Sequence, residues 1–159
     1  MLNGGRCLIN TEYITLQLIE VKDIADEIIV VDSSSSDNTA VIALSYNARV
    51  IVHHFMGYGV QKNFATQQAT NDWILSLDAD EALTPELRQS ILEIKKGPAS
   101  SVYQMSRLTN YCGKWIRHCG WYPQPKLRFF NKNKFKINSN KVHESVVMYD
   151  NKARIGRSE

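Results

Sequence analysis

The nine residues from Trp73 to Glu81 constrain the fold of this chain more than any other stretch. A short, mostly apolar segment, 73–77, leads directly into an Asp-Ala-Asp triplet. An apolar run without polar alternation is typical of a strand buried on both faces. Side chains two apart on an extended chain point the same way, so we expect the carboxylates of Asp78 and Asp80 to converge where the strand ends. Such oxygens suit Mg²⁺ or Mn²⁺, although an acidic turn after a core strand would give the same pattern.

The first 97 residues alternate predicted strands and helices. Apolar spacing and short buried runs predict helices at about 14–25, 39–46, 60–69 and 85–96, and further strands at 27–31 and 50–52. The last helix has clear end signals, with Thr84 as N-cap, Pro85 in the first turn and Gly97 after the last turn. This order predicts an α/β fold with a mainly parallel sheet and helices on both faces.

Ligands of such sheets bind at the carboxyl ends of the strands. Asp32 follows the predicted strand at 27–31, and the Asp78 and Asp80 pair follows the later one, so all three fall at that edge. Lys62 lies near the start of a predicted helix, where its charge would help to bind a diphosphate. A solvated surface lysine is the competing interpretation.

Residues after Gly97 follow a different pattern. Alternation at 102–108 predicts a strand, and the runs 126–130 and 135–137 around a turn predict a β-hairpin. We therefore divide the single domain into an α/β half, residues 1–97, and a second half, residues 98–159.

Charge divides the chain at nearly the same place. Residues 1–94 carry 5 Lys and Arg against 13 Asp and Glu, whereas residues 95–159 carry 14 against 3, within a net charge of +3. An acidic half suits metal binding, and a basic half suits phosphates or an anionic membrane surface. Solvated surface charge explains most of the individual lysines equally well.

Length and composition are those of one soluble globular domain. No apolar run is long enough to span a bilayer, and the amino end lacks signal-peptide regions, so we expect a cytoplasmic protein. Cys7, Cys112 and Cys119 form no Cys-x-x-Cys pair, which favours reduced thiols over a disulfide framework.

Several motifs in order carry a resemblance to a known family. They are VVDSSSSDNT at 30–39, GYGVQKNFA at 57–65, DWILSLDADE at 72–81, WIRHCGWYP at 115–123 and VHE at 142–144. In them the chain resembles inverting family 2 glycosyltransferases of the GT-A fold, and among these bacterial lipopolysaccharide-core β-1,4-glucosyltransferases. The resemblance covers roughly residues 20 to 150 and rests on several motifs rather than one.

The resemblance implies a donor site in the first half, which would bind the nucleotide-sugar. Asp32 would accept hydrogen bonds from a uracil N–H or a ribose hydroxyl, and Asp37 would contact the nucleotide or cap a helix. A divalent cation, Mg²⁺ or Mn²⁺, would bridge two phosphates and take up charge as UDP leaves. The implied nucleotide-sugar ligands are Thr11, Asp32, Asp37, Lys62, Asn63 and Asp78, and the implied metal ligands are Asp78 and Asp80.

The second half would bind the acceptor and supply the base that inversion requires. We expect Glu144 to be that base, with His143, Glu81 and Asp150 as other candidates. An ion pair with a nearby lysine is the competing role for Glu144. Trp rings stack on sugar faces and Arg binds phosphates in a bidentate manner, so the expected acceptor residues are Arg117, Trp121, Arg128 and His143.

The resemblance therefore predicts transfer of a hexose, with glucose as the expected sugar, from a UDP-sugar to a lipopolysaccharide inner-core saccharide with inversion. We expect the protein to act at the cytoplasmic face of the inner membrane, through peripheral contact, and not on nucleic acid. Its basic half would supply attraction to anionic lipid.

The chain departs from the family at both ends. The first strand of the family ends in a Thr-x-Asn-Glu segment, for which Cys7 to Glu12 is at best a shortened version, and the chain stops soon after Glu144. We therefore expect truncation at both ends, and a degenerate remnant with weak or no activity is the alternative. A nucleotidyltransferase, disfavoured by the lack of a Gly-rich phosphate loop, and an acidic–basic binding module without chemistry are the other candidates.

Overall fold

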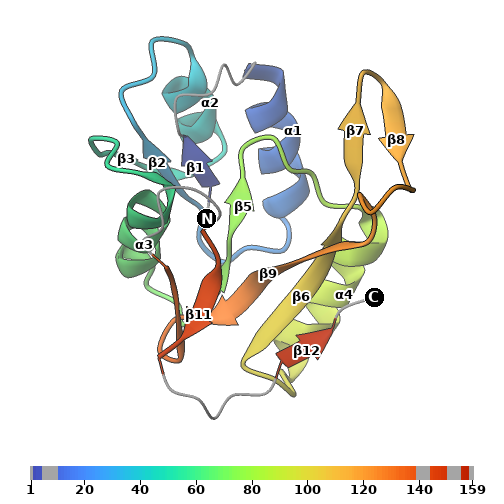
Figure 1. The fold of residues 1–159 in the computed structure, drawn as a ribbon. Helices are drawn as coiled ribbons and strands as arrows, with labels where there is room; N and C mark the ends of the chain where they lie inside the picture. Colours follow the sequence, from blue (N-terminus) through green and yellow to red (C-terminus); the bar gives the residue numbers. More distant parts are fainter. Residues whose placement is uncertain (1, 5–10, 139–143, 150–154, 158–159) are drawn as a thin grey trace.

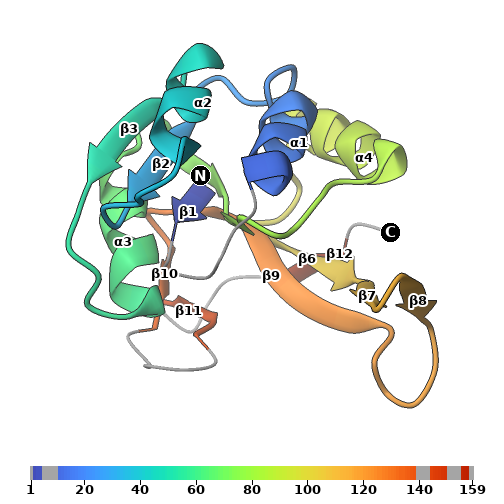
Figure 2. The same cartoon turned by 90° about the horizontal axis from the view of Figure 1, so that it is seen from above.

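Two four-stranded sheets run through the molecule, and helices lie on both sides of the first (Figures 1 and 2). The computed structural model describes residues 2–4, 11–138, 144–149 and 155–157. The helices are α1 (Thr11–Val21), α2 (Thr39–Ser45), α3 (Tyr58–Gln68) and α4 (Pro85–Lys96). The strands are β1 (Leu2–Gly4), β2 (Ile29–Asp32), β3 (Arg49–Val52), β4 (Trp73–Leu75), β5 (Leu77–Asp78), β6 (Val102–Arg107), β7 (Thr109–Tyr111), β8 (Lys114–Ile116), β9 (Gln124–Asn131), β10 (Phe135–Ile137), β11 (Val146–Met148) and β12 (Ile155–Arg157).

The first sheet, which we call sheet A, has the order β3-β2-β1-β5, and all its strands are parallel. Every residue of β2 is buried, so both of its faces are covered. Val30 belongs to the main core cluster with residues of α1, α2 and α4, whereas Ile29 and Val31 pack with Ala65 of α3. Neighbouring residues of a strand point to opposite faces. The predicted parallel sheet with helices on both faces is therefore confirmed (Figure 2).

The second sheet, sheet B, has the order β12-β6-β9-β4 and contains antiparallel pairs. β4 pairs with β9 of sheet B, whereas β5, which follows directly, pairs with β1 of sheet A. Between them the buried Ser76 donates its backbone N–H to the carbonyl of Arg128, 2.8 Å away. The prediction of one continuous strand ending at Asp78 is thus wrong, because the chain changes partner strand at Ser76.

The β-hairpin predicted from 126–130 and 135–137 is also wrong. β9 pairs with β4 and β6, and β10 pairs with β11, which comes later in the chain. Phe130 and Phe135, on either side of the turn, still pack in one apolar cluster, so burial rather than mutual pairing explains the pattern. A hairpin forms instead from β7 and β8, which project from the molecule (Figure 1).

The first strand differs from the shortened segment predicted at 7–12. β1 lies at Leu2–Gly4, between β2 and β5, while Thr11 and Glu12 are the first residues of α1. Residues 7–10 lie outside the described part of the chain. Because β1 pairs with β2 on one side and with β5 on the other, it is a central strand of sheet A.

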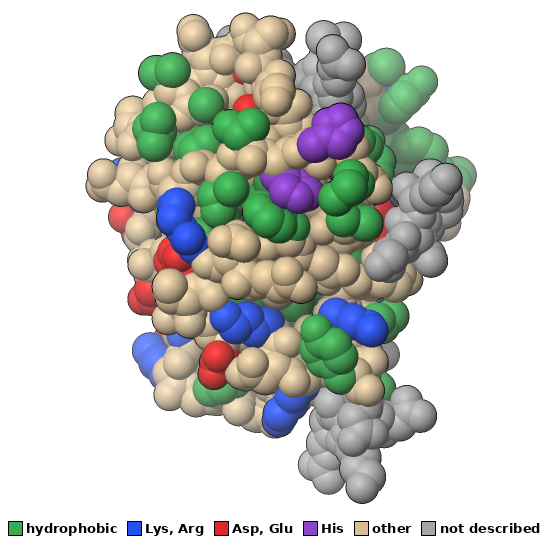
Figure 3. Space-filling view, turned by 90° about the vertical axis from the view of Figure 1, so that its left-hand side faces the viewer, with side chains coloured by type: hydrophobic (Ala, Val, Ile, Leu, Met, Phe, Trp, Pro, Cys, Tyr) green, Lys and Arg blue, Asp and Glu red, His purple; other side chains and the backbone are tan. Residues whose placement is uncertain are grey.

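One edge of sheet A is formed by β3, and this side of the molecule carries several exposed apolar side chains (Figure 3). They come from α2, the end of β3 and the loop that follows, and include Val41, Leu44, Val52 and Met56. None of the described helices is long and apolar enough to cross a membrane.

Phe130 offers a test of the second core cluster. Its side chain is fully buried, and β9 pairs it with Ile74 on one side and Val102 on the other. We expect Phe130→Ala to lower the free energy of unfolding by about 3–5 kcal/mol, because the ring is lost and a cavity remains. Urea denaturation measures this change, with Val41→Ala, at a side chain 67% exposed, as a control expected to change it by less than about 0.5 kcal/mol. Equal effects of the two substitutions would contradict the assigned core.

Candidate active site

The carboxyl ends of β2 and β5 lie on either side of β1 and place two predicted acids at one edge of sheet A. In the register of the strands, Gly4 pairs with Asp32 and Asn3 pairs with Asp78. This is the edge at which ligands of parallel sheets bind. The structure therefore brings Asp32 and Asp78 to the same end of the sheet, as the sequence predicted.

Lys62 of α3 is a buried cation, and its side chain is only 3% exposed. Its ammonium Nζ lies 2.5 Å from Asp78 Oδ1 and 2.6 Å from Glu144 Oε1. Burial of an unpaired ammonium destabilises a fold strongly. The two carboxylates offset that cost by pairing with the Lys62 ammonium. Lys62 is not a solvated surface lysine, and Glu144 does form the lysine ion pair that was its competing role.

Arg128 of β9 approaches the same carboxylate from the other side. Its guanidinium lies 2.7 Å from Asp78 Oδ2 and also forms an ion pair with Glu81. The result is a chain of alternating charges, Glu144, Lys62, Asp78, Arg128 and Glu81, which we call the charge network. Arg128 was predicted as an acceptor residue, and the structure directs its side chain to Asp78, the last residue of β5, and to Glu81 in the turn after it.

The surroundings shift the pKa values of this network in opposite directions. Burial disfavours the charged form of Asp78, but the neighbouring Arg128 and Lys62 outweigh it, so the pKa of that carboxyl is lowered. Burial raises the pKa of Glu81, and the nearby Asp78 adds to this, against the opposing effect of Arg128. Burial also opposes the charge of Arg128, yet Glu81 and Asp78 raise its pKa.

A buried glutamine, which the sequence analysis did not single out, holds the turn after β5. Gln17 of α1 donates from its amide to the backbone carbonyls of Asp78 and Glu81. Glu81 in turn accepts a hydrogen bond from the backbone N–H of Asp78 at 3.0 Å. Gln17 lies between Ile14 and Leu18 on the buried face of the helix. A polar residue within that apolar spacing is the signal that would have marked it.

Asp32 is buried, and no described cation pairs with it. Its carboxylate accepts hydrogen bonds from the backbone N–H of Ser35, at 3.0 Å, and from the Ser35 hydroxyl. Asp37 accepts a hydrogen bond from the backbone N–H of Thr39, at the start of α2, at 3.0 Å. Hydrogen bonds from Thr39 lower the pKa of Asp37. The N-cap of α2 is Asn38, so Asp37 lies one residue before the cap and binds the first residue of the helix.

Asn63 joins two elements far apart in the chain. Its amide oxygen accepts from the backbone N–H of Ile137 at 3.0 Å, and its amide nitrogen donates to the Ile137 carbonyl at 2.5 Å. α3 is thereby tied to β10. Thr11 is the first residue of α1, and its side chain lies outside the described part of the structure.

Asp80 lies in the turn after β5 and is exposed. Because β5 ends at Asp78, two residues before Asp80, the extended geometry on which their expected convergence rested does not reach Asp80. Carboxylate oxygens are the right ligand type for Mg²⁺ or Mn²⁺. Both oxygens of Asp78, however, already have cationic partners. Within residues 14–138 and 144–149, no three His, Cys, Asp or Glu side chains cluster to hold a metal.

The other predicted acceptor residues lie elsewhere. Arg117 follows β8 and Trp121 follows the β7–β8 hairpin; both are exposed, and Trp121 makes an edge contact with Tyr111. The hairpin and α3 lie on opposite sides of the molecule in both views (Figures 1 and 2). The structure thus does not bring Arg117 and Trp121 to the charge network, and His143 and Asp150 lie outside the described residues.

Removal of the buried cation should destabilise the fold. Lys62→Met would leave Asp78 and Glu144 close together without their shared partner, and we expect a loss of about 3–5 kcal/mol in the free energy of unfolding. The double variant Lys62→Met/Glu144→Gln should recover part of this loss. Urea denaturation compares them, with the exposed Lys114→Met as a control that changes little. A Lys62→Met loss no larger than the control would show that the ion pairs contribute nothing.

Acidification should weaken the contribution of Asp78. Because the folded pKa of Asp78 is lowered, its stabilising effect is complete above the unfolded value of about 3.9 and is lost as pH falls through the lower folded value. Asp78→Asn should therefore be less stable than the wild type at neutral pH, with a gap that narrows below about pH 4. Thermal unfolding at a series of pH values measures the gap, and Asp23→Asn, at an exposed acid, is the matched control. A gap independent of pH would contradict the network.

Comparison with known proteins identifies a family for this chain. The profile of "Glycosyl transferase family 2" matches residues 11–159. A lipopolysaccharide core biosynthesis glycosyltransferase, LpsC of Rhizobium meliloti, is 31% identical over 148 residues, which cover 89% of this chain and 54% of LpsC. The chain spans about half the length of the curated relatives that it matches over most of its own sequence.

Two solved structures share the fold. TarS of S. aureus in complex with UDP has a TM-score of 0.60 at 17% identity, covering 99% of this chain and 59% of TarS. The mannosyltransferase PcManGT of Pyrobaculum calidifontis, in complex with GDP-Man and Mn²⁺, has a TM-score of 0.50 at 18% identity, covering 67% of this chain and 34% of that protein. The family match over nearly the whole chain, together with this fold, leads to one conclusion: the chain belongs to glycosyl transferase family 2, with a GT-A-like α/β fold.

Proposed function

We propose that this protein transfers a hexose, with glucose as the expected sugar, from a UDP-sugar to a lipopolysaccharide-core saccharide with inversion. The observation that carries the proposal is the buried Lys62 ammonium between Asp78 and Glu144. It joins an acid at the carboxyl edge of the sheet to an acid from the second half of the chain. The similarity to LpsC supports the acceptor class, and the UDP complex of TarS supports the donor class.

The donor would lie along the edge formed by β2 and β5. Asp32, held by Ser35, offers carboxylate oxygens to a uracil N–H or a ribose hydroxyl. Lys62 and Arg128 already face one anion, the Asp78 carboxylate, so they are placed to share their charge with a diphosphate. Neutralisation of that charge would stabilise UDP as the bond from phosphate oxygen to the anomeric carbon breaks. Asp37, Asn63 and Thr11 would then support the site rather than contact the reacting atoms.

A divalent cation would bind between Asp78, Asp80 and the donor phosphates. When bound, it would supply Lewis-acid stabilisation of the leaving diphosphate. Asp80 is exposed and therefore accessible to such an ion, whereas Asp78 would share its oxygens with Lys62 and Arg128. The Mn²⁺ complex of PcManGT supports use of a divalent cation.

Glu144 would take the proton from the acceptor hydroxyl while the hydroxyl oxygen forms its bond to the anomeric carbon. Its Oε1 is held by Lys62, which fixes the direction of the carboxylate relative to the donor edge. His143 would contact the acceptor next to Glu144, and Arg117 and Trp121, which lie away from the charge network, would contact only a more distant part of a long saccharide. Residues 1–97 would bind the donor, and these acceptor contacts all belong to the second half, residues 98–159. The basic charge of the second half would favour peripheral contact with the cytoplasmic face of the inner membrane.

Turnover gives the direct test. The purified protein with UDP-glucose, Mn²⁺ or Mg²⁺ and a heptose acceptor should release UDP, measured by a coupled assay. Glu144→Gln should reduce kcat by about 10²–10⁴-fold, because the proton acceptor is lost, while thermal shift with UDP still reports binding. The exposed Glu86→Gln is the matched control and should keep full turnover.

Three results would count against the proposal. Full turnover by Glu144→Gln would remove Glu144 as the base. Binding of UDP without turnover on any UDP-sugar would favour the degenerate remnant. No UDP release together with no thermal shift on addition of UDP and Mn²⁺ would contradict the enzyme as a whole.

A further inference from the structure

Large aromatic side chains are exposed on the β7–β8 hairpin and on the loop that follows it. Tyr111 ends β7 and is 62% exposed, and Trp115 in β8 is 61% exposed. Trp121 and Tyr122 in the loop are exposed as well. The hairpin projects from the molecule in both views (Figures 1 and 2). Exposed apolar side chains that lie together are a common mark of an interaction site.

Both faces of this hairpin carry an aromatic ring. In the register of the two strands, Asn110 pairs with Trp115 and Tyr111 pairs with Lys114. Directly paired residues point to the same face, and neighbours along a strand point to opposite faces. Trp115 therefore lies on one face and Tyr111 on the other, where the ring of Trp121 meets it edge-on with centroids 6.1 Å apart. All four paired residues are exposed, so the rest of the described chain covers neither face.

Charge around the hairpin is positive. Residues 94–143 carry 11 Lys and Arg and no Asp or Glu, so the nearest acids along the chain are Glu93 and Glu144. Lys114 at the tip of the hairpin and Arg117 after β8 are both exposed. An anionic partner is therefore favoured at this end of the molecule.

The arrangement of rings and cations favours a lipid surface as that partner. Trp and Tyr are enriched at the headgroup level of bilayers, and Lys and Arg are attracted to anionic lipid there. A bilayer surrounds an inserted hairpin on both faces, whereas a sugar stacked on a ring, or a flat protein surface, covers one. Rings on opposite faces, with a cation between them at the tip, thus fit a bilayer better than a saccharide or a protein.

We propose that the tip of the β7–β8 hairpin inserts into the headgroup region of a membrane that contains anionic phospholipid. Tyr111 and Trp115 are the inserted rings, and Lys114 lies beside lipid phosphate. This adds a point of contact and an orientation to the membrane contact in the proposed function, on which it rests only for the lipid-borne acceptor. Lys62 and α3 lie on the opposite side of the molecule, so the acceptor would reach the charge network through its saccharide (Figures 1 and 2).

Vesicle binding tests this contact on the whole protein without any donor sugar. Vesicles of equal parts phosphatidylcholine and phosphatidylglycerol should sediment the protein, and vesicles of phosphatidylcholine alone should bind it much more weakly. Tyr111→Ser/Trp115→Ser should weaken binding to the anionic vesicles by about tenfold or more, because two interfacial anchors are lost. Tyr149→Ser, at a ring that is 60% exposed elsewhere on the surface, is the matched control and should bind as the wild type does.

A second pair of variants tests the cation at the tip. Lys114→Met should weaken binding to the anionic vesicles by about fivefold, because one charge near the lipid surface is lost. Lys134→Met removes the same charge from an exposed lysine in the turn between β9 and β10, and it should leave binding nearly unchanged. Equal losses for the two variants would show that only the overall charge matters, and would overturn insertion of the hairpin.

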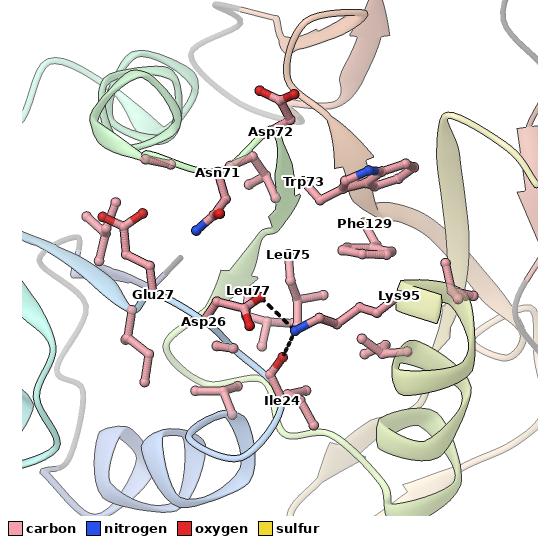
Figure 4. A pocket seen from close by; sticks show the side chains of 18 of the residues that line it. Ile24, Asp26, Glu27, Asn71, Asp72, Trp73, Leu75, Leu77, Lys95 and Phe129 are labelled. Atoms are coloured by element: carbon pink, nitrogen blue, oxygen red, sulfur yellow. Dashed lines mark hydrogen bonds and ion pairs between the residues drawn. The ribbon is translucent and has the colours of Figure 1, made fainter. Parts of the chain in front are cut away.

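Tryptophan emission locates the inserted ring. Trp73, Trp115 and Trp121 are the three tryptophans of the chain. Trp73 lies beside Phe129 in the lining of the cavity shown in Figure 4 and serves as the internal reference. In Trp121→Phe, emission should shift to shorter wavelength on anionic vesicles and be quenched by lipids brominated near the headgroup. In Trp115→Phe/Trp121→Phe, where only Trp73 remains, neither change should occur.

Three results would overturn the proposal. They are no binding of the wild type to anionic vesicles, full binding by Tyr111→Ser/Trp115→Ser, and Trp115 emission that vesicles leave unchanged. A shift of Trp115 emission with a water-soluble core oligosaccharide, but not with vesicles, would make the hairpin a saccharide surface instead. Vesicle binding without UDP release in the turnover assay would support the membrane contact and count against the transfer reaction alone.

Discussion

The buried ammonium of Lys62 is the constraint on which the arrangement of the site depends. The Lys62 side chain is only 3% exposed, so its charge must be paired with carboxylates. These are Asp78, at the end of β5, and Glu144, just before β11. The next residue of α3, Asn63, binds both backbone groups of Ile137 in β10. Two consecutive residues of one helix thus tie the β10–β11 pair to sheet A, and the same contacts place Glu144 close to Asp78 at the carboxyl edge of that sheet.

The junction of the two sheets positions Arg128, the second cation of the charge network. At Ser76 the chain leaves β4, which pairs with β9, and enters β5, which pairs with β1. The backbone of Arg128 accepts a hydrogen bond from Ser76, and its side chain reaches Asp78 and Glu81. The Asp-Ala-Asp triplet therefore lies where two sheets meet, and Lys62 of α3 and Arg128 of sheet B flank its first acid. The charges at this site are thus already paired with one another.

Local signals in the sequence predicted local structure well. Thr84 accepts the expected capping hydrogen bond at the start of α4, and the acids that end β2 and β5 lie at one edge of a parallel sheet. Pairing over long distances was not predictable in the same way. Apolar runs around a turn suggested a hairpin, yet Phe130 and Phe135 share a cluster while their strands pair elsewhere. Burial gives the same apolar pattern whichever strand is the partner.

The sequence alone determined the family, the alternation of helices and strands, and the acids at the strand ends, because these depend on residue type and short spacing. Only the tertiary structure decided the partners of those acids. Lys62 meets Glu144 across 82 positions and Arg128 meets Asp78 across 50, and neither pairing follows from spacing along the chain. It likewise decided that β1 pairs with β2 on one side and with β5 on the other, since strand register is set by neighbours in space.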